Sequence, residues 1–163
     1  MASSLDTDLS CKRLTPKSFD CPDGAIRNAA IPSSEQIDAD KLKHQHHREY
    51  SQPNTAATTV TIPLHVARFA GTLKQFVAGS IAACIGAATV TLDLKKNNTS
   101  VLSSILTLDN ANAARVVEAA TLNPALVDYV AGDFFELVIT ATAGGGTLAT
   151  GLHASAVFNE GSQ

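Results

Sequence analysis

The densest group of side chains that could do chemistry is the stretch 44–48, His-Gln-His-His-Arg. On a helix, His44 and His47 would share a face because they lie three residues apart, and two imidazoles on one face can bind a metal. Two lysines precede the stretch, and a basic patch of this kind complements an acidic surface on a partner. We therefore predict a partner-binding patch, with a small metalloprotein that uses His44, His46 and His47 as an alternative.

Other candidate catalytic groups lack the partners that catalysis needs. Serine and threonine are abundant, but no Gly-x-Ser-x-Gly nucleophile elbow occurs. His65 and His153 stand alone in predicted strands, and an isolated histidine does not make a catalytic triad. Asp133 and Glu136 are three residues apart, which places them on different faces of a strand. Gly144–Gly146 lacks the Lys-Ser/Thr that follows a phosphate loop. We expect no enzyme activity and no cofactor.

The three cysteines are Cys11, Cys21 and Cys84. An odd count, in a chain whose start resembles no secretory signal peptide, indicates reduced thiols and synthesis in the cytosol. Cys11 and Cys21 are ten residues apart, which is wider than the usual spacing of zinc ligands, so a zinc site with the nearby histidines is a minor alternative. Cys84 lies in an apolar run and is expected in the core.

Composition excludes several classes of function. The 163 residues carry a net charge of −3, which argues against a protein that coats nucleic acid. Aromatic residues make up 5% and there is no tryptophan, which weighs against sugar- or base-stacking modules. Two stretches without charge, 75–92 and 137–159, are interrupted by glycines, which favours buried strands over membrane spans.

Charge divides the chain into two parts. Of the first 53 residues 15 are charged, against 12 of the remaining 110. Four of the six prolines also lie in the first part, which is too polar and too interrupted to bury a core of its own. We predict an extended N-terminal arm over residues 1–53, used for attachment to a partner, and a β-sandwich domain over residues 54–163.

The arm contains one stretch that predicts a helix. Ser33–Gln36 reads as a capping box, and Ile37–Tyr50 follows it without glycine or proline. The apolar stripe of this helix is sparse, so we expect it to dock on another chain or on its own sandwich. The residues predicted to bind the partner are Ile37, Leu42, His44, His46, His47, Arg48 and Tyr50.

The second part predicts short strands joined by turns. Ala88–Lys95 alternates strictly between apolar and polar residues, which is typical of a strand with one buried face. Asn97-Asn98 tolerates positive φ and would turn the chain into a partner strand over Ser100–Leu108, with a bulge at Ser103-Ser104. Pro63 in the strand Thr58–Arg68 indicates a sheet edge or a bulge.

Further strands are expected along the rest of the second part. Thr72–Ala78 would end at Gly79-Ser80, and residues 111–120 favour a strand over a helix because their surroundings are rich in strands. Asn123-Pro124 predicts a turn, and the glycines at 144–146 predict a hairpin tip between strands Phe134–Ala141 and Thr147–Phe158. The result is an all-β, antiparallel sandwich of seven or eight strands, and we expect a jelly roll.

Four stretches resemble small virion proteins of tailed bacteriophages and prophages. They are Ile37–Tyr50, Ala88–Asn98, Ser104–Asp109 and Ala131–Ile139. The resemblance is to head decoration (cement) or head-fibre proteins, and it covers about residues 31–158. It implies an arm that attaches to the capsid and a jelly roll that projects outward, often as a trimer.

The physics of the second part agrees with this resemblance. Alanine and threonine supply 21 and 14 of its 110 residues, which gives flat faces with little charge that association with other copies would cover. We therefore expect a structural virion protein on the capsid surface, whose partners are the major capsid protein and further copies of itself, and which binds neither nucleic acid nor membrane. A receptor- or glycan-binding module of a phage tail or fibre is the main alternative.

Overall fold

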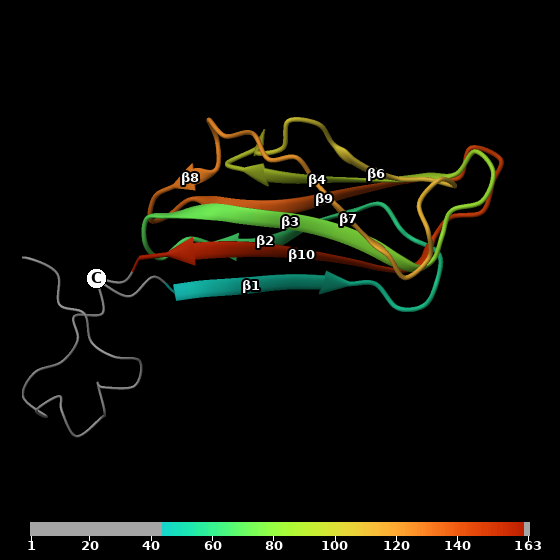
Figure 1. Ribbon diagram of the computed structural model, residues 1–163, viewed down its shortest axis with the longest axis horizontal. Coiled ribbons are helices and arrows are strands. Elements are labelled where there is room, and N and C mark those ends of the chain that lie inside the picture. Colours follow the sequence, from blue (N-terminus) through green and yellow to red (C-terminus); the bar gives the residue numbers. More distant parts are fainter. Residues whose placement is uncertain (1–43, 162–163) are drawn as a thin grey trace, which may run out of the picture. The chain divides into compact units, whose positions relative to one another are not determined.

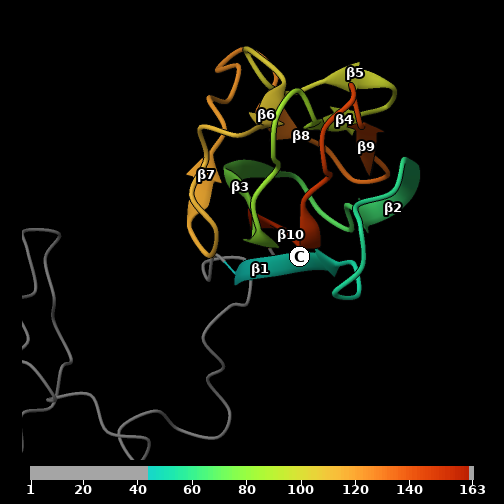
Figure 2. The same cartoon turned by 90° about the vertical axis from the view of Figure 1, so that its right-hand side faces the viewer.

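A computed structural model describes residues 44–161, which form two antiparallel β-sheets (Figures 1 and 2). These residues contain no helix, and therefore no helix that is long and apolar enough to span a membrane. The strands are β1 His44–Ser51, β2 Val60–Val66, β3 Gly71–Ala82, β4 Thr89–Lys96, β5 Thr99–Ser100, β6 Leu106–Leu108, β7 Val117–Ala119, β8 Asp128–Tyr129, β9 Phe134–Thr142 and β10 Thr150–Glu160.

The chain crosses repeatedly from one sheet to the other. The first sheet has the order β1-β10-β3-β7, with β8 also on β3, and the second has the order β2-β9-β4-β5, with β6 also on β4. Every pairing is antiparallel. Since β5 and β6 share one neighbour and β7 and β8 share another, the strands of the described residues occupy eight positions. The expected all-β fold with two antiparallel sheets is confirmed.

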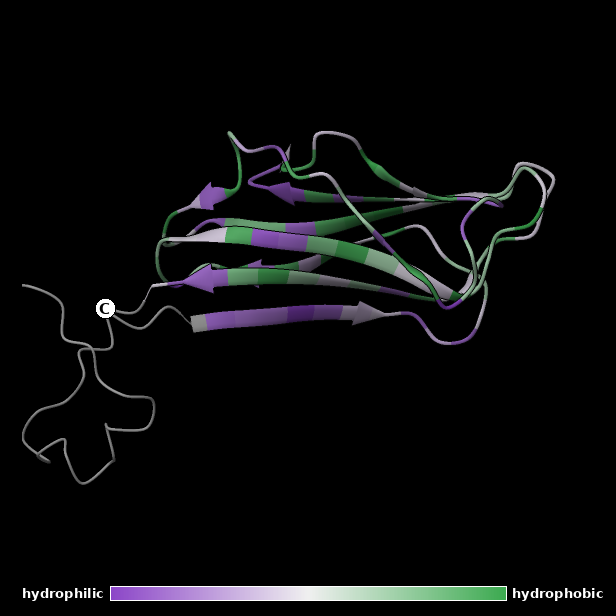
Figure 3. Ribbon diagram, viewed as in Figure 1, coloured by the Kyte–Doolittle hydropathy of each residue, from purple (hydrophilic) through white to green (hydrophobic). Residues whose placement is uncertain are grey.

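Alternating side chains from both sheets fill the space between them. On β4, Val90, Leu92 and Leu94 are fully buried, as the alternation of Ala88–Lys95 predicts. Phe135, Leu137 and Ile139 of β9 and Leu152, Ala154, Ala156 and Phe158 of β10 complete much of the core. Figure 3 shows the alternation of hydrophobic and hydrophilic positions along these strands. Cys84 is buried as expected, with its thiol 3.6 Å from the carbonyl oxygen of Leu108.

The prediction of a helix over Ile37–Tyr50 is wrong for residues 44–50, which the structure describes. His44–Ser51 is a strand that pairs along its whole length with β10, from His44 opposite Glu160 to Ser51 opposite His153. These eight residues therefore belong to the sandwich, and the expected boundary at Pro53 is corrected. The alternation of half-buried and exposed residues along β1 fits a pleated edge strand, whereas its apolar content is too low for a packed helix. Residues 33–43 lie outside the described residues.

Strand β3 runs past the point where the sequence predicted its end. It continues through Gly79 and Ser80 to Ala82, pairing with β10 on one side and with β7 on the other. A Cβ atom at Gly79 would lie 2.6 Å from the carbonyl oxygen of Val116 and 2.8 Å from the ring of His153. This glycine therefore serves close packing within a strand and does not end it. The last strand also extends further than expected, to Glu160.

Two other predicted strands are shorter than expected. Residues 100–108 divide into β5 and β6, because the backbone between them leaves β4 and forms an isolated bridge between Leu102 and Leu122. Of residues 111–120, only Val117–Ala119 is a strand. A local turn precedes it, in which the Asp109 carboxylate accepts a hydrogen bond of 2.8 Å from the N–H of Ala111.

The predicted turn at Asn97-Asn98 and the predicted irregularity at Pro63 agree with the structure. Asn97 and Asn98 adopt φ angles of 48° and 68°, as a two-residue hairpin turn between β4 and β5 requires. Pro63 lies on β2, an edge strand, where the pairing with β9 shifts register between Pro63 and His65. The glycines at 144–146 do form a turn, with Gly144 and Gly145 at φ angles of 53° and 84°. The predicted hairpin is wrong, however, because this turn leads from β9 in the second sheet to β10 in the first, and the two strands do not pair.

Replacing Asn98 by glycine tests this turn. Asn98 is exposed and has positive φ, so Asn98→Gly should raise the free energy of unfolding by up to about 1 kcal/mol. Asn97→Gly is the matched control, because the Asn97 amide donates to Asp133 Oδ1 at 2.7 Å and accepts from the N–H of Phe134 at 2.9 Å. Asn97→Gly removes both hydrogen bonds and should lower the free energy of unfolding by about 1–2 kcal/mol. Urea denaturation of both variants measures the difference, and equal effects would contradict the turn geometry.

Candidate functional site: a buried glutamate and histidine cluster

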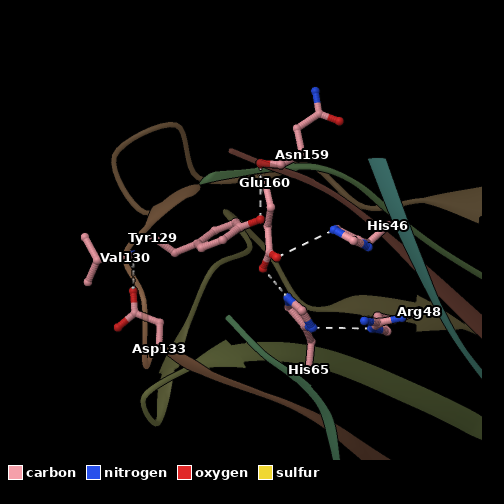
Figure 4. Close-up of polar contacts among 8 residues, drawn as sticks. All are labelled: His46, Arg48, His65, Tyr129, Val130, Asp133, Asn159 and Glu160. Carbon is pink, nitrogen blue, oxygen red and sulfur yellow. Dashed lines mark hydrogen bonds and ion pairs between the residues drawn. The ribbon is translucent and has the colours of Figure 1, made fainter. Parts of the chain in front are cut away.

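The carboxyl group of Glu160 lies in the interior near the C-terminal end of β10. Glu160 is 3% exposed, and its side chain points inward because it alternates with the core residues of the same strand. Its Oε1 lies 2.7 Å from Nε2 of His65, and its Oε2 lies 3.6 Å from Nε2 of His46 (Figure 4). A carboxylate in such a place needs hydrogen-bond donors, because burial removes its water.

His65 supplies the shorter of these contacts from the opposite sheet. It is 6% exposed, and its ring lies 4.5 Å from the ring of Phe158 and 6.1 Å from that of Phe135, between centroids. Strict alternation along β2 would place His65 on the outer face, next to Thr61 and Pro63. The register shift at Pro63 reverses this and places the imidazole inside. The feature of the sequence that could have indicated the inward position of His65 was therefore Pro63, which marks the bulge, and not the histidine itself.

Arg48 fixes the position of the proton on His65. Its Nε lies 3.3 Å from Nδ1 of His65, and a guanidinium can only donate. Nδ1 of His65 must therefore accept, so the proton of the neutral ring lies on Nε2 and is donated to Glu160. We call Glu160, His65, His46 and Arg48 the Glu160 cluster. Because both nitrogens of His65 are engaged, His65 offers no lone pair to a metal ion in this arrangement. Within the described residues, no group of three His, Cys, Asp or Glu side chains has the geometry to hold a metal.

Tyr129 closes the cluster on the side of β8. Its ring packs edge-on against Phe135 and Phe158, at centroid distances of 5.3 and 5.9 Å, and its hydroxyl donates to the carbonyl oxygen of Asn159 at 3.2 Å. Burial, with the charge of Glu160 as the second cause, raises the pKa of this hydroxyl, which therefore stays a donor. Gly71 makes room for it, since a Cβ there would overlap the tyrosine ring and the Asn159 carbonyl.

Asp133 lies in the turn before β9, near the same end of the sandwich. Its Oδ2 accepts from the N–H of Val130 at 2.9 Å, and its Oδ1 accepts from the Asn97 amide at 2.7 Å. The Val130 N–H is the largest cause that lowers the pKa of Asp133. Partial burial opposes this, while Asn97 and the charge of Lys96 lower the pKa further. Glu136 lies three residues further on, where it faces Lys95 of β4 across the second sheet.

Of the predicted partner-binding residues, those on β1 whose burial is described alternate between the inner and the outer face of the strand. Ile37 and Leu42 lie outside the described residues. His46, Arg48 and Tyr50 are half-buried, with the first two in the Glu160 cluster and Tyr50 against the core, whereas His47 is exposed. The helical face expected to bring His44 and His47 together does not exist, because both residues belong to β1. His153 also lies apart from His65, half-buried with its ring over Gly79.

No family model matches the chain, and no curated protein matches it. Among solved structures, the chain is similar to the structure of Turnip Yellow Mosaic Virus at 100 K, with a TM-score of 0.33 and 10% sequence identity. This match covers 74% of the chain and 94% of the viral chain.

Removing His65 tests whether the Glu160 cluster acts as a unit. His65→Ala should lower the free energy of unfolding by about 3 kcal/mol or more, because the buried carboxylate loses its 2.7 Å donor. Glu160→Ala should have a similar cost, and the double variant should cost about 1–3 kcal/mol less than the sum, as measured by urea denaturation at neutral pH. His47→Ala, on the exposed side of β1, should change stability by less than about 0.5 kcal/mol. If the stability losses of the two single variants simply add up in the double variant, the interaction between His65 and Glu160 is contradicted.

The lowered pKa of Asp133 predicts that its carboxylate contributes to the free energy of unfolding at neutral pH and that this contribution is lost in acid. Because its pKa is lower in the folded than in the unfolded chain, its hydrogen bonds stabilise the fold fully above the ordinary value of 3.8, and this gain disappears as pH falls through the lower folded value. The stability difference between the unmodified protein and Asp133→Asn should therefore be constant above about pH 5 and should shrink below the ordinary value. Denaturation curves at several pH values measure it, and a difference that grows in acid would have the wrong sign.

Proposed function

We propose that the protein is a structural virion protein whose sandwich is a jelly roll. The observation that carries this proposal is the order of the strands. Numbering the eight strand positions along the chain gives 1-8-3-6 in one sheet and 2-7-4-5 in the other, which is the order of a jelly roll. Jelly rolls recur in viral capsid proteins, in lectins and in cupins.

The interior of the sandwich favours a structural role over the other two classes. Phe76, Phe135 and Phe158, with leucine, isoleucine and valine side chains, fill the space between the sheets. Within the described residues, the polar side chains that reach this space hydrogen-bond to one another and leave no polar group there directed at a ligand. The described residues include two tyrosines and no tryptophan, and lectins rely on such rings to stack on sugars.

We propose further that the protein decorates a capsid, as a cement or head-fibre protein at the virion surface. Residues 1–43, the part of the arm that precedes β1, would attach to the major capsid protein, with Ile37 and Leu42 among the contacts. The sandwich would project from the shell and associate with other copies, as a trimer by the resemblance. This proposal needs no catalysis, cofactor, nucleic acid or membrane.

Under this proposal, the Glu160 cluster would resist the separation of β1 from the sandwich when residues 1–43 are pulled. A pull on residues 1–43 reaches the sandwich at His44, and the first pair that it would separate is His44 and Glu160. An edge strand pulled from one end peels residue by residue, so the bonds nearest that end resist first. The contacts of His46 and Arg48 with Glu160 and His65 join β1 to both sheets at this place.

Two truncations separate the arm from the sandwich. Deletion of residues 1–43 should leave the thermal midpoint within a few degrees and abolish attachment to capsids, as measured by co-sedimentation. Deletion of residues 1–51 also removes β1, which exposes Glu160, and should lower the midpoint by about 10 °C or more. Attachment that survives the shorter deletion would contradict the role of residues 1–43.

Immunogold electron microscopy of particles from the virus or prophage that carries the gene tests the location. Labels spread over the capsid shell are expected. Labels confined to a tail, with binding on a glycan array, would support the receptor-binding alternative, and the absence of labelled particles would contradict a virion role.

A further inference from the structure

The Glu160 cluster contains two histidines that contact different oxygens of one buried carboxylate. The rings of His46 and His65 are stacked, with their centroids 6.4 Å apart (Figure 4). Imidazole is the side chain that ordinarily gains a proton between about pH 5 and 8. The charge of the cluster therefore depends on pH, and the proposed function makes no use of this property.

One nitrogen of His65 decides how the cluster responds to a proton. Nδ1 accepts a hydrogen bond of 3.3 Å from Nε of Arg48, while Nε2 donates to Glu160 at 2.7 Å. An added proton must go to Nδ1, because Nε2 already carries one. The new N–H then faces the N–H of Arg48, and two donors cannot form a hydrogen bond with each other. Protonation of His65 and its contact with Arg48 therefore exclude each other, whereas the contact with Glu160 becomes an ion pair.

The balance of charge in the cluster changes in the same direction. With both histidines neutral, Arg48 is the one cation of the cluster and Glu160 the one anion. Protonation of His46 and His65 gives three cations around one carboxylate, and two of the three, His46 and Arg48, belong to β1. Like charges 6.4 Å apart repel each other strongly where water is largely excluded, and the side chains of His65 and Glu160 are each 4% exposed. Protons taken up by the cluster therefore act against the docking of β1.

The other titratable groups on the surrounding elements have partners of their own or lie nearer the surface. The Tyr129 hydroxyl of β8 donates to the carbonyl oxygen of Asn159, and Lys96 of β4 donates to those of Leu126 and Asp128. Asp93 of β4 is buried, where it accepts from the Ser100 hydroxyl. The remaining groups are half-buried or exposed, and within the described residues none of them forms an ion pair: His47, Glu49 and Tyr50 of β1, Lys74 of β3, Lys95 of β4, Glu136 of β9, His153 of β10, and Arg68 and Asp133 in the neighbouring turns.

We propose that the Glu160 cluster is a pH-sensitive switch, in which protonation of His65 detaches Arg48 and loosens β1 from the sandwich. With β1 released, His65 can take a proton without facing Arg48, so the released state binds more protons than the docked state. The free energy that favours the docked strand therefore falls as pH falls. This property belongs to the fold and does not require attachment to a capsid. Under the proposed function, it would make the hold on residues 1–43 depend on pH, and only this consequence rests on that function.

Hydrogen–deuterium exchange of the full-length protein at about pH 7.5 and about pH 5 tests the switch. Rates are first corrected for the intrinsic effect of pH on exchange. The protection of peptides that cover residues 44–51 should then fall about tenfold or more at the lower pH, because β1 opens more often. The protection of β3 and β9 should change by less than about threefold, since neither strand loses a contact.

Three variants identify the group that takes the proton. His65→Gln can still donate to Glu160 but has no titratable ring, so the protection of β1 should differ by less than about threefold between the two pH values. His47→Gln, on the exposed side of the same strand, is the matched control and should keep the full response. Glu160→Gln removes the carboxylate that favours the charged ring, so the response should move to lower pH by about one unit or more.

Nuclear magnetic resonance of the unmodified protein gives a test that does not depend on the folding of any variant. The ring signals of His65 and the Nε–H signal of Arg48 should change with the same midpoint as pH is lowered. Three results would each overturn the switch: equal protection of β1 at both pH values, a full response in His65→Gln, or an Arg48 signal that does not follow His65. Capsid attachment is measured separately by co-sedimentation at neutral pH, so failure of the switch and failure of the proposed function are distinguishable.

Discussion

Glu160 places a carboxyl group between two packed sheets, where water cannot solvate it, and much of the local architecture follows from that. His65 must lie inside to donate to it, and the register shift at Pro63 turns it inward. Arg48 must then lie beside His65 to fix its proton, which requires β1 to run along β10. The two sheets have no backbone hydrogen bonds between them, so these side-chain bonds join their edges at β1 and β2.

The same cluster explains why β1 has one register. A slip by one residue would turn every side chain of the strand to the other face. His46 and Arg48 would then leave the interior, and Glu49 would enter it near Glu160, where two carboxylates repel each other. A buried polar pair often adds little net stability compared with apolar packing, but it penalises wrong arrangements strongly. For a strand with few apolar residues, that penalty replaces the hydrophobic pattern that normally sets register.

This is also why the sequence predicted some strands and missed β1. The alternation of β4, the Asn97-Asn98 turn and the role of Pro63 are local signals, and all three were predicted correctly. On β1, polar residues occupy almost every position, and Figure 3 shows the strand purple to pale with no alternating hydrophobic positions, so hydrophobic periodicity carries no information there. The partner that makes an inward histidine favourable is remote, since His65 and Glu160 are 95 positions apart. The capping box and the lack of glycine then favoured a helix by default. The strand predicted over residues 111–120 is limited to Val117–Ala119 for a related reason, because the backbone of Arg115 is set by its hydrogen bond to Ser80 of β3 and not by its neighbours in sequence.

The two edges of the first sheet have different chemistry. One edge is β1, which is polar, tied to the Glu160 cluster and continuous with residues 1–43. The other edge is β7, which is three residues long, carries Glu118 between Val117 and Ala119, and pairs with β3 over residues 77–79. Because β10 and β3 lie between the two edges, the side chains that set the register of β1 do not act on β7, where backbone pairing with β3 and the contact of Arg115 with Ser80 hold the strand.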